Sequence, residues 1–105
     1  MRKIGIESWK VGKGKDERTE NILIAINVLL SNKKPEEIPR GIDKFRLFGR
    51  LSKAFEKAEK NNILELEETD YSFLKKTIEN DIPSLWAMNK NAFKAIEDFL
   101  NAKEE

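Results

Sequence analysis

The stretch KFRLFGRLSKAFEKAEKNN, residues 44–62, carries the clearest structural pattern in this chain. Its large apolar side chains recur every three or four residues, which places them on one face of an α-helix. These positions are Phe45, Phe48, Leu51, Phe55 and Ala58. We expect Asp43 to cap the start of this helix and Asn61–Asn62 to end it.

A short strand is predicted directly after this helix. Apolar and polar side chains alternate in ILEL, residues 63–66, so Glu65 is expected on the solvent side. The N-terminal segment RKIGIESWKV, residues 2–11, alternates in the same way at Ile4 and Ile6. We therefore expect a short N-terminal strand that pairs with the short central one.

Three further helices are predicted. NILIAINVLL, residues 21–30, favours a helix capped by Asp16 or Thr19, although a buried strand is the alternative for this apolar run. Another helix begins near Glu67, and the last begins at Asn89 or Asn91. The fold class is α+β, mostly helical, with about four helices in a single compact domain over residues 1–105. Its core is expected to gather Phe48, Leu51, Phe55, Leu74, Ile78, Phe93 and Ile96.

The composition excludes several kinds of chemistry. The chain has no cysteine and no histidine, which removes disulfides, thiolate zinc sites and the commonest general base. No apolar run approaches the ~18 residues of a membrane span, so we expect no membrane partner and a cytoplasmic location. Charged residues make up 37% of the chain and are rich in lysine and glutamate, as in proteins of thermophiles.

The acidic stretch LELEETDYSFLKKTIEND, residues 64–81, raises the question of a metal or catalytic site. Glu67, Glu68 and Asp70 fall in the first turn of a predicted helix, where carboxylates face unpaired backbone N–H groups. A Mg²⁺ or Ca²⁺ site needs carboxylates converging from several elements, usually with a glycine-bearing loop, and none occurs here. We interpret the stretch as structural and predict no metal and no cofactor.

No motif of the chain indicates an enzyme. GKGKDER, residues 12–18, lacks the spacing of a phosphate-binding loop, because Glu17 stands where a third glycine is required. The serines have no histidine to activate them and none lies in a G-x-S-x-G turn. We therefore expect no catalytic residues.

A basic ridge is predicted along the central helix. It consists of Arg46, Arg50, Lys53, Lys57 and Lys60, spaced by four, three, four and three residues. Such a ridge can follow a phosphate backbone. Residues 40–60 carry seven basic and three acidic side chains, a net +4, whereas residues 63–81 carry two and six, a net −4. We favour a solvated face, or one that docks on the acidic 65–70 segment of the same or a neighbouring copy.

Aromatic and apolar residues outside the clean stripes are candidate anchors for a protein partner. Trp9 and Trp86 either close the ends of a small core or lie on an interface, where Trp and Met are enriched. The candidate partner-binding residues are Trp86, Met88, Phe99 and Leu100. Together with the uneven charge, they lead us to expect weak, salt-sensitive, head-to-tail self-association.

The order of these features resembles small proteins of about a hundred residues encoded in tailed bacteriophages and prophages. The resemblance is carried by the acidic segment that runs into DYSFLKK and by the tail from Trp86 to AIEDFL, roughly the C-terminal half. It implies a non-enzymatic viral protein that acts through protein contacts, in virion assembly or as an accessory factor. The alternative from the residues alone is a small nucleic-acid-binding regulator that uses the basic ridge.

Overall fold

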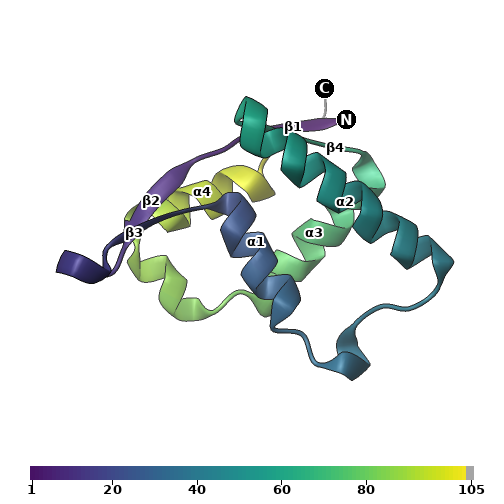
Figure 1. The fold of residues 1–105 in the computed structure, drawn as a ribbon, viewed down its shortest axis with the longest axis horizontal. Coiled ribbons are helices and arrows are strands. Elements are labelled where there is room, and N and C mark those ends of the chain that lie inside the picture. Colours follow the sequence, from purple (N-terminus) through teal and green to yellow (C-terminus); the bar gives the residue numbers. More distant parts are fainter. Residues whose placement is uncertain (104–105) are drawn as a thin grey trace.

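The predicted central helix and the two predicted short strands are all present in the fold. The computed structural model describes residues 1–103 and contains four α-helices and two small antiparallel sheets in that range (Figure 1). The strands are β1 (Arg2–Gly5), β2 (Ser8–Val11), β3 (Arg18–Asn21) and β4 (Ile63–Leu66). The helices are α1 (Ile22–Ser31), α2 (Ile42–Asn61), α3 (Glu68–Asp81) and α4 (Lys90–Leu100). Three short 3-10 helices complete the chain: η1 (Gly14–Asp16), η2 (Pro35–Glu37) and η3 (Ser84–Met88). The α+β, mostly helical prediction is confirmed.

The N-terminal strand pairs with the central one, as predicted. In the antiparallel β1–β4 pair, Ile4 lies opposite Leu64. Both side chains are buried, while Glu65 points away from the core. α2 enters β4 through Asn62, whose left-handed backbone (φ 59°) ends the helix and turns the chain.

A second hairpin, β2–β3, was not predicted. Trp9 pairs with Glu20 across it, and Trp9 is 5% exposed. Gly12 allows the connection, because its φ is +84° and a Cβ there would lie 2.5 Å from the Asp16 carbonyl oxygen.

Two of the predicted helix caps are wrong. α1 is capped by Asn21, whose Oδ1 accepts a hydrogen bond from the Ile24 N–H at 3.0 Å, because the hairpin keeps Asp16 and Thr19 outside the helix. α2 begins two residues early, after Gly41 with φ +104°, so Asp43 lies in its first turn. Of the two predicted caps of α4, Asn89 is the cap and Asn91 lies within the first turn.

The helices and the β1–β4 sheet enclose one main core. Leu51, Phe55, Leu74, Ile78 and Ile96 are buried in it together, and Phe48 packs against its edge. Phe93 was predicted to be buried but is 51% exposed, because it lines an open groove where α3, η3 and α4 meet. Phe45 was expected on the buried face of α2 but is 75% exposed. The first turns of α2 extend past the helices that cover the rest of it (Figure 1).

Candidate protein-interaction surface

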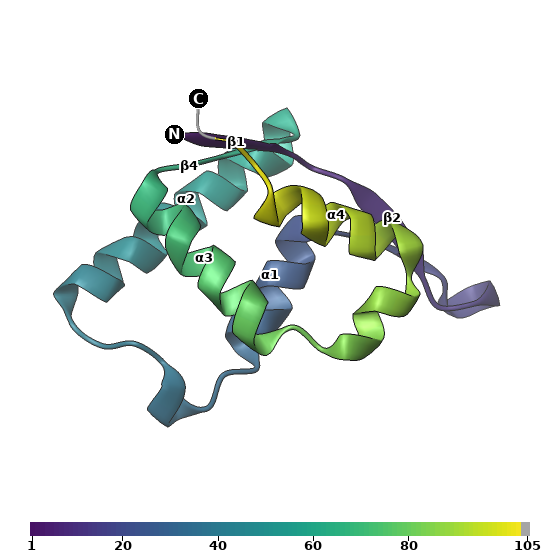
Figure 2. The same cartoon turned by 180° about the vertical axis from the view of Figure 1, so that it is seen from behind.

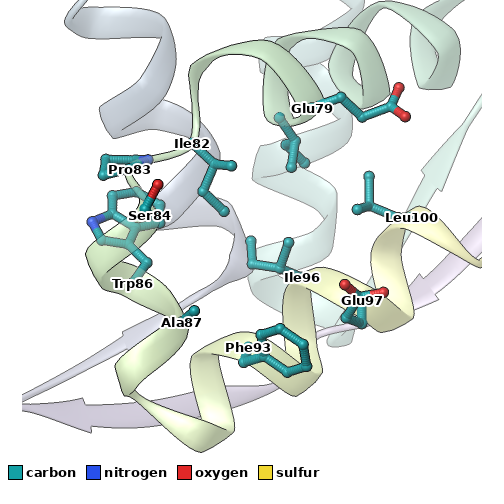
Figure 3. Close-up of a pocket in the computed structure, with 11 residues that line it drawn as sticks. Glu79, Ile82, Pro83, Ser84, Trp86, Ala87, Phe93, Ile96, Glu97 and Leu100 are labelled. Atoms are coloured by element: carbon teal, nitrogen blue, oxygen red, sulfur yellow. The ribbon is translucent and has the colours of Figure 1, made fainter.

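An apolar groove lies where the end of α3, η3 and α4 meet, with a volume of about 400 Å³ (Figure 3). Ile82 and Ile96 point toward one another across it, and Phe93 projects from the first turn of α4. The residues that line it are Ile78, Glu79, Ile82, Pro83, Ser84, Trp86, Ala87, Phe93, Ile96, Glu97 and Leu100. This volume is within the range of ~300–1,000 Å³ typical of binding pockets.

The chain holds the groove open through η3. Pro83 cannot continue α3, and the Trp86 N–H donates to the Pro83 carbonyl at 3.1 Å, which folds the next residues into a single tight turn. Asn89 then fixes the far end of η3. Its Oδ1 accepts from the Ala92 N–H at 3.2 Å, and its Nδ2 donates to the Lys10 carbonyl at 3.0 Å. η3 is therefore fixed at both ends: it follows directly from α3, and Asn89 at its far end is hydrogen-bonded to β2.

Trp86 forms a wall between two hollows. On one side it lines the groove, and on the other it lines a smaller hollow of about 190 Å³ with Trp9, Val28 and Leu85. Trp86 is half-buried, whereas Trp9 is buried. The sequence left both tryptophans open as core or interface residues, and the structure places Trp9 in the core and Trp86 at the surface between the hollows.

η3 and the groove lining also expose large apolar side chains to solvent. Leu85 is 76% exposed, Met88 81% and Phe93 51%. The charged residues among the described groove lining are Glu79 and Glu97, one on α3 and one on α4 (Figure 3). We call the groove together with Leu85 and Met88 the η3 surface. It combines an apolar floor with an acidic rim.

The predicted anchor residues divide between this surface and the core. Trp86 and Leu100 line the groove, and Met88 is exposed beside it. Phe99 is fully buried, with its ring centroid 5.2 Å from that of Tyr71, so its predicted contact with a partner is wrong. Phe99 lies one residue from Leu100 on a helix, and neighbouring residues face different directions.

The basic ridge is partly neutralised within the chain. Arg50 donates to both carboxylate oxygens of the buried Asp70, at 2.8 and 3.0 Å, and this hydrogen bonding raises the pKa of Arg50. Lys57 Nζ lies 3.6 Å from Glu65. The predicted docking of the ridge on the acidic segment therefore occurs inside one copy. Within residues 1–103, Arg46, Lys53 and Lys60 make no ion pair.

Carboxylates of the acidic stretch form ion pairs with basic residues of other elements. Glu68 accepts hydrogen bonds from Arg2 at 2.9 and 2.7 Å, which lower the pKa of Glu68 and tie the start of α3 to β1. Asp70 and Glu65 are paired with the ridge as described above. No group of three or more acidic side chains among residues 1–103 is arranged to hold a metal ion. In the same range, no helix is both long and apolar enough to cross a membrane.

Comparison with protein-family models, with curated proteins and with solved structures finds no significant match to this chain. What the protein does must therefore be argued from its own surfaces.

The sequence missed most of the η3 surface. Phe93 was assigned to the core because it lies three residues before Ile96 on the predicted stripe of α4. The sequence gives no reason to place Leu85 or Glu79 at an interaction surface, because the groove forms only where α3 and α4 converge. One signal was present: SLWAM, residues 84–88, holds apolar side chains that follow neither helical nor strand spacing.

Proposed function

We propose that this protein is a non-enzymatic binding protein whose η3 surface receives an amphipathic, basic segment of a protein partner. The observation that carries the proposal is the acid-rimmed apolar groove with its exposed Phe93, together with the exposed Leu85 and Met88 of η3. Contiguous exposed apolar surface rimmed by polar groups is typical of interaction sites. An apolar stripe on the partner would fill the groove while its lysines or arginines face Glu79 and Glu97.

The chemistry of the lining supports a macromolecular partner. Trp and Met are enriched at protein interfaces, and a half-buried Trp is a frequent hot spot there. Met88 and Leu85 have no role in the core, and covering their apolar area would contribute about 25 cal/mol per Å². Exposed rim charges contribute more to orientation and association rate than to affinity.

The resemblance of the C-terminal half to small phage and prophage proteins supports a place for this binding in virion assembly or in accessory work in the host cytoplasm. The segment that carries that resemblance includes Trp86 and the α4 residues of the groove.

A second candidate function is nucleic-acid binding by the basic ridge. It is favoured by Arg46, Lys53 and Lys60, which recur every seven residues and so project from one face of α2. It is weakened by Arg50 and Lys57, because their charges are already paired with Asp70 and Glu65. Binding through the ridge would fall steeply with salt, since each phosphate contact releases a counterion.

Fluorescence anisotropy with a labelled synthetic helix tests the proposed function. The probe carries leucines at three- and four-residue spacing with flanking lysines, and a matched probe carries glutamates instead. We expect saturable binding of the lysine probe alone. Phe93→Asp should weaken it at least ~10-fold, by placing a charge in the groove. Ile63→Glu, at a 45% exposed position on β4, is the control and should leave it unchanged. Equal binding of both probes, or equal affinity in the Phe93 variant, would contradict the proposal.

A further inference from the structure

A second exposed apolar patch lies at the start of α2. Ile42 is 59% exposed and Phe45 75% exposed, and Ile38, in the connection before α2, is 45% exposed. Ile42 and Phe45 are three residues apart on the helix and therefore lie near each other on its surface. The first turns of α2 extend past the helices that cover the rest of it (Figure 1), and the side chains of Ile42 and Phe45 there are exposed.

This patch is basic. Arg40, Lys44 and Arg46 belong to the same segment, with Asp43 as its one acidic residue, so residues 38–46 carry a net +2. The positive end of the α2 dipole adds to this sign. We call residues 38–46 the α2 tip. Its chemistry, large apolar side chains with flanking cations, is the complement of the η3 surface.

The tip and the groove belong to different parts of the molecule. The Lys44 ammonium lies 5.5 Å from the centroid of the Phe73 ring, so the tip sits beside the first half of α3. The groove lies at the other end of α3, at Glu79–Pro83. α3 has 14 residues, which at ~1.5 Å per residue makes it about 21 Å long. The start of α2 and the junction of α3, η3 and α4 also lie apart in the view from behind (Figure 2), so a chain cannot fill its own groove.

We propose that the α2 tip of one copy docks in the η3 surface of a second copy. Phe45 and Ile42 enter the apolar groove, and the cations of the tip face Glu79 and Glu97. This inference rests on the proposed function and names its partner. Because the two halves of the contact differ, each docked pair leaves one free tip and one free groove, and copies add head to tail into chains or rings.

The patch is small, so the contact is weak and depends on concentration. Interfaces that hold stable complexes bury roughly 1,200–2,000 Å², more than a groove and a helix end provide. The rim charges are exposed and screened, so salt weakens the contact.

Sedimentation velocity of the full chain over a concentration series at low salt tests the proposal. We expect the average mass to rise past that of a dimer in the wild type and to fall back toward the monomer at high salt. Phe45→Glu and Phe93→Asp should each remain monomeric under the same conditions. Ile63→Glu, which alters exposed apolar surface elsewhere, should associate like the wild type. Circular dichroism of each variant checks that it is folded.

Mixing the two monomeric variants identifies the geometry. Phe45→Glu keeps an intact groove and Phe93→Asp keeps an intact tip, so the mixture should form a one-to-one dimer and nothing larger. Self-association of Phe45→Glu at wild-type strength, or a mixture that stays monomeric, would overturn the proposal.

The lysine probe separates this inference from the proposed function. A wild-type chain that stays monomeric but still binds the probe in its groove overturns self-docking and leaves the proposed function standing. A chain that does neither overturns both.

Discussion

At the scale of single residues, Tyr71 joins α3 to the end of α4. Its hydroxyl lies 2.6 Å from the Phe99 carbonyl oxygen and 3.0 Å from that of Leu100, where orphan carbonyls of α4 need a donor. The Arg2 guanidinium lies 4.6 Å from the centroid of its ring. These contacts fix the end of α4, and with it the Leu100 wall of the groove.

Replacing Tyr71 by Phe should cost about 1–2 kcal/mol at neutral pH, the usual value of a buried hydrogen bond. The cost should depend on pH. Burial raises the pKa of Tyr71 in the folded state above its ordinary value, so its contribution is present below about pH 10 and is lost as pH rises through the folded pKa. Urea unfolding of wild type and Tyr71→Phe should therefore converge in stability above about pH 10. A constant difference across this range would contradict the assignment.

Local sequence signals predicted the residue-scale features that depend on neighbours along the chain. Asn89 was recognised as a cap, and Glu65 was placed outward, because cap chemistry and strand alternation are local rules. Asp43 was misplaced because the positive φ of Gly41 starts α2 two residues earlier.

At the scale of elements, α2 illustrates what periodicity can and cannot show. Helical spacing identified its apolar face, but spacing does not reveal how far the neighbouring elements reach along that face. α2 has 20 residues and α3 has 14, so at ~1.5 Å per residue α2 is about 9 Å longer. Phe55 is buried against the core and Phe45 is left outside it.

These two phenylalanines should therefore respond very differently to truncation. Phe55→Ala should cost about 3–5 kcal/mol, which is a large part of the stability of a domain this small. Phe45→Ala should change stability by less than ~0.5 kcal/mol, because its ring is already in water. Urea unfolding of the two variants makes the comparison. A Phe55 variant that melts within a few degrees of wild type would show that α2 is placed wrongly.

The β2–β3 hairpin and the position of η3 could not be predicted from the spacing of apolar residues. β3 reads RTEN and has no apolar residue to alternate, so nothing in it indicates a strand. The groove beside η3 arises from the convergence of α3 and α4, which depends on tertiary packing. Trp86 and Met88 were nevertheless predicted as candidate anchors for a partner, because they fit no stripe.

At the scale of the whole molecule, some of the unevenly distributed charges form ion pairs within the chain, and others lie on exposed surfaces. Part of the basic ridge neutralises the acidic segment within one chain, through Arg50 with Asp70 and Lys57 with Glu65. The charges outside those pairs include the cations of the α2 tip and the two glutamates of the groove rim. The sequence predicted self-association from the two charged segments, but the complementary surfaces proposed here are the α2 tip and the η3 surface.

We propose that the η3 surface, and not the basic ridge, is the surface through which this protein binds its partner. Amide chemical-shift mapping tests it directly, with an isotope-labelled chain titrated separately with the lysine probe and with a short DNA duplex at low salt. We expect saturable shifts at Ile82, the Trp86 indole and Phe93 with the probe, and no saturable shifts along Arg46–Lys60 with the duplex. Saturable shifts along the ridge with DNA, and none in the groove with the probe, would contradict it.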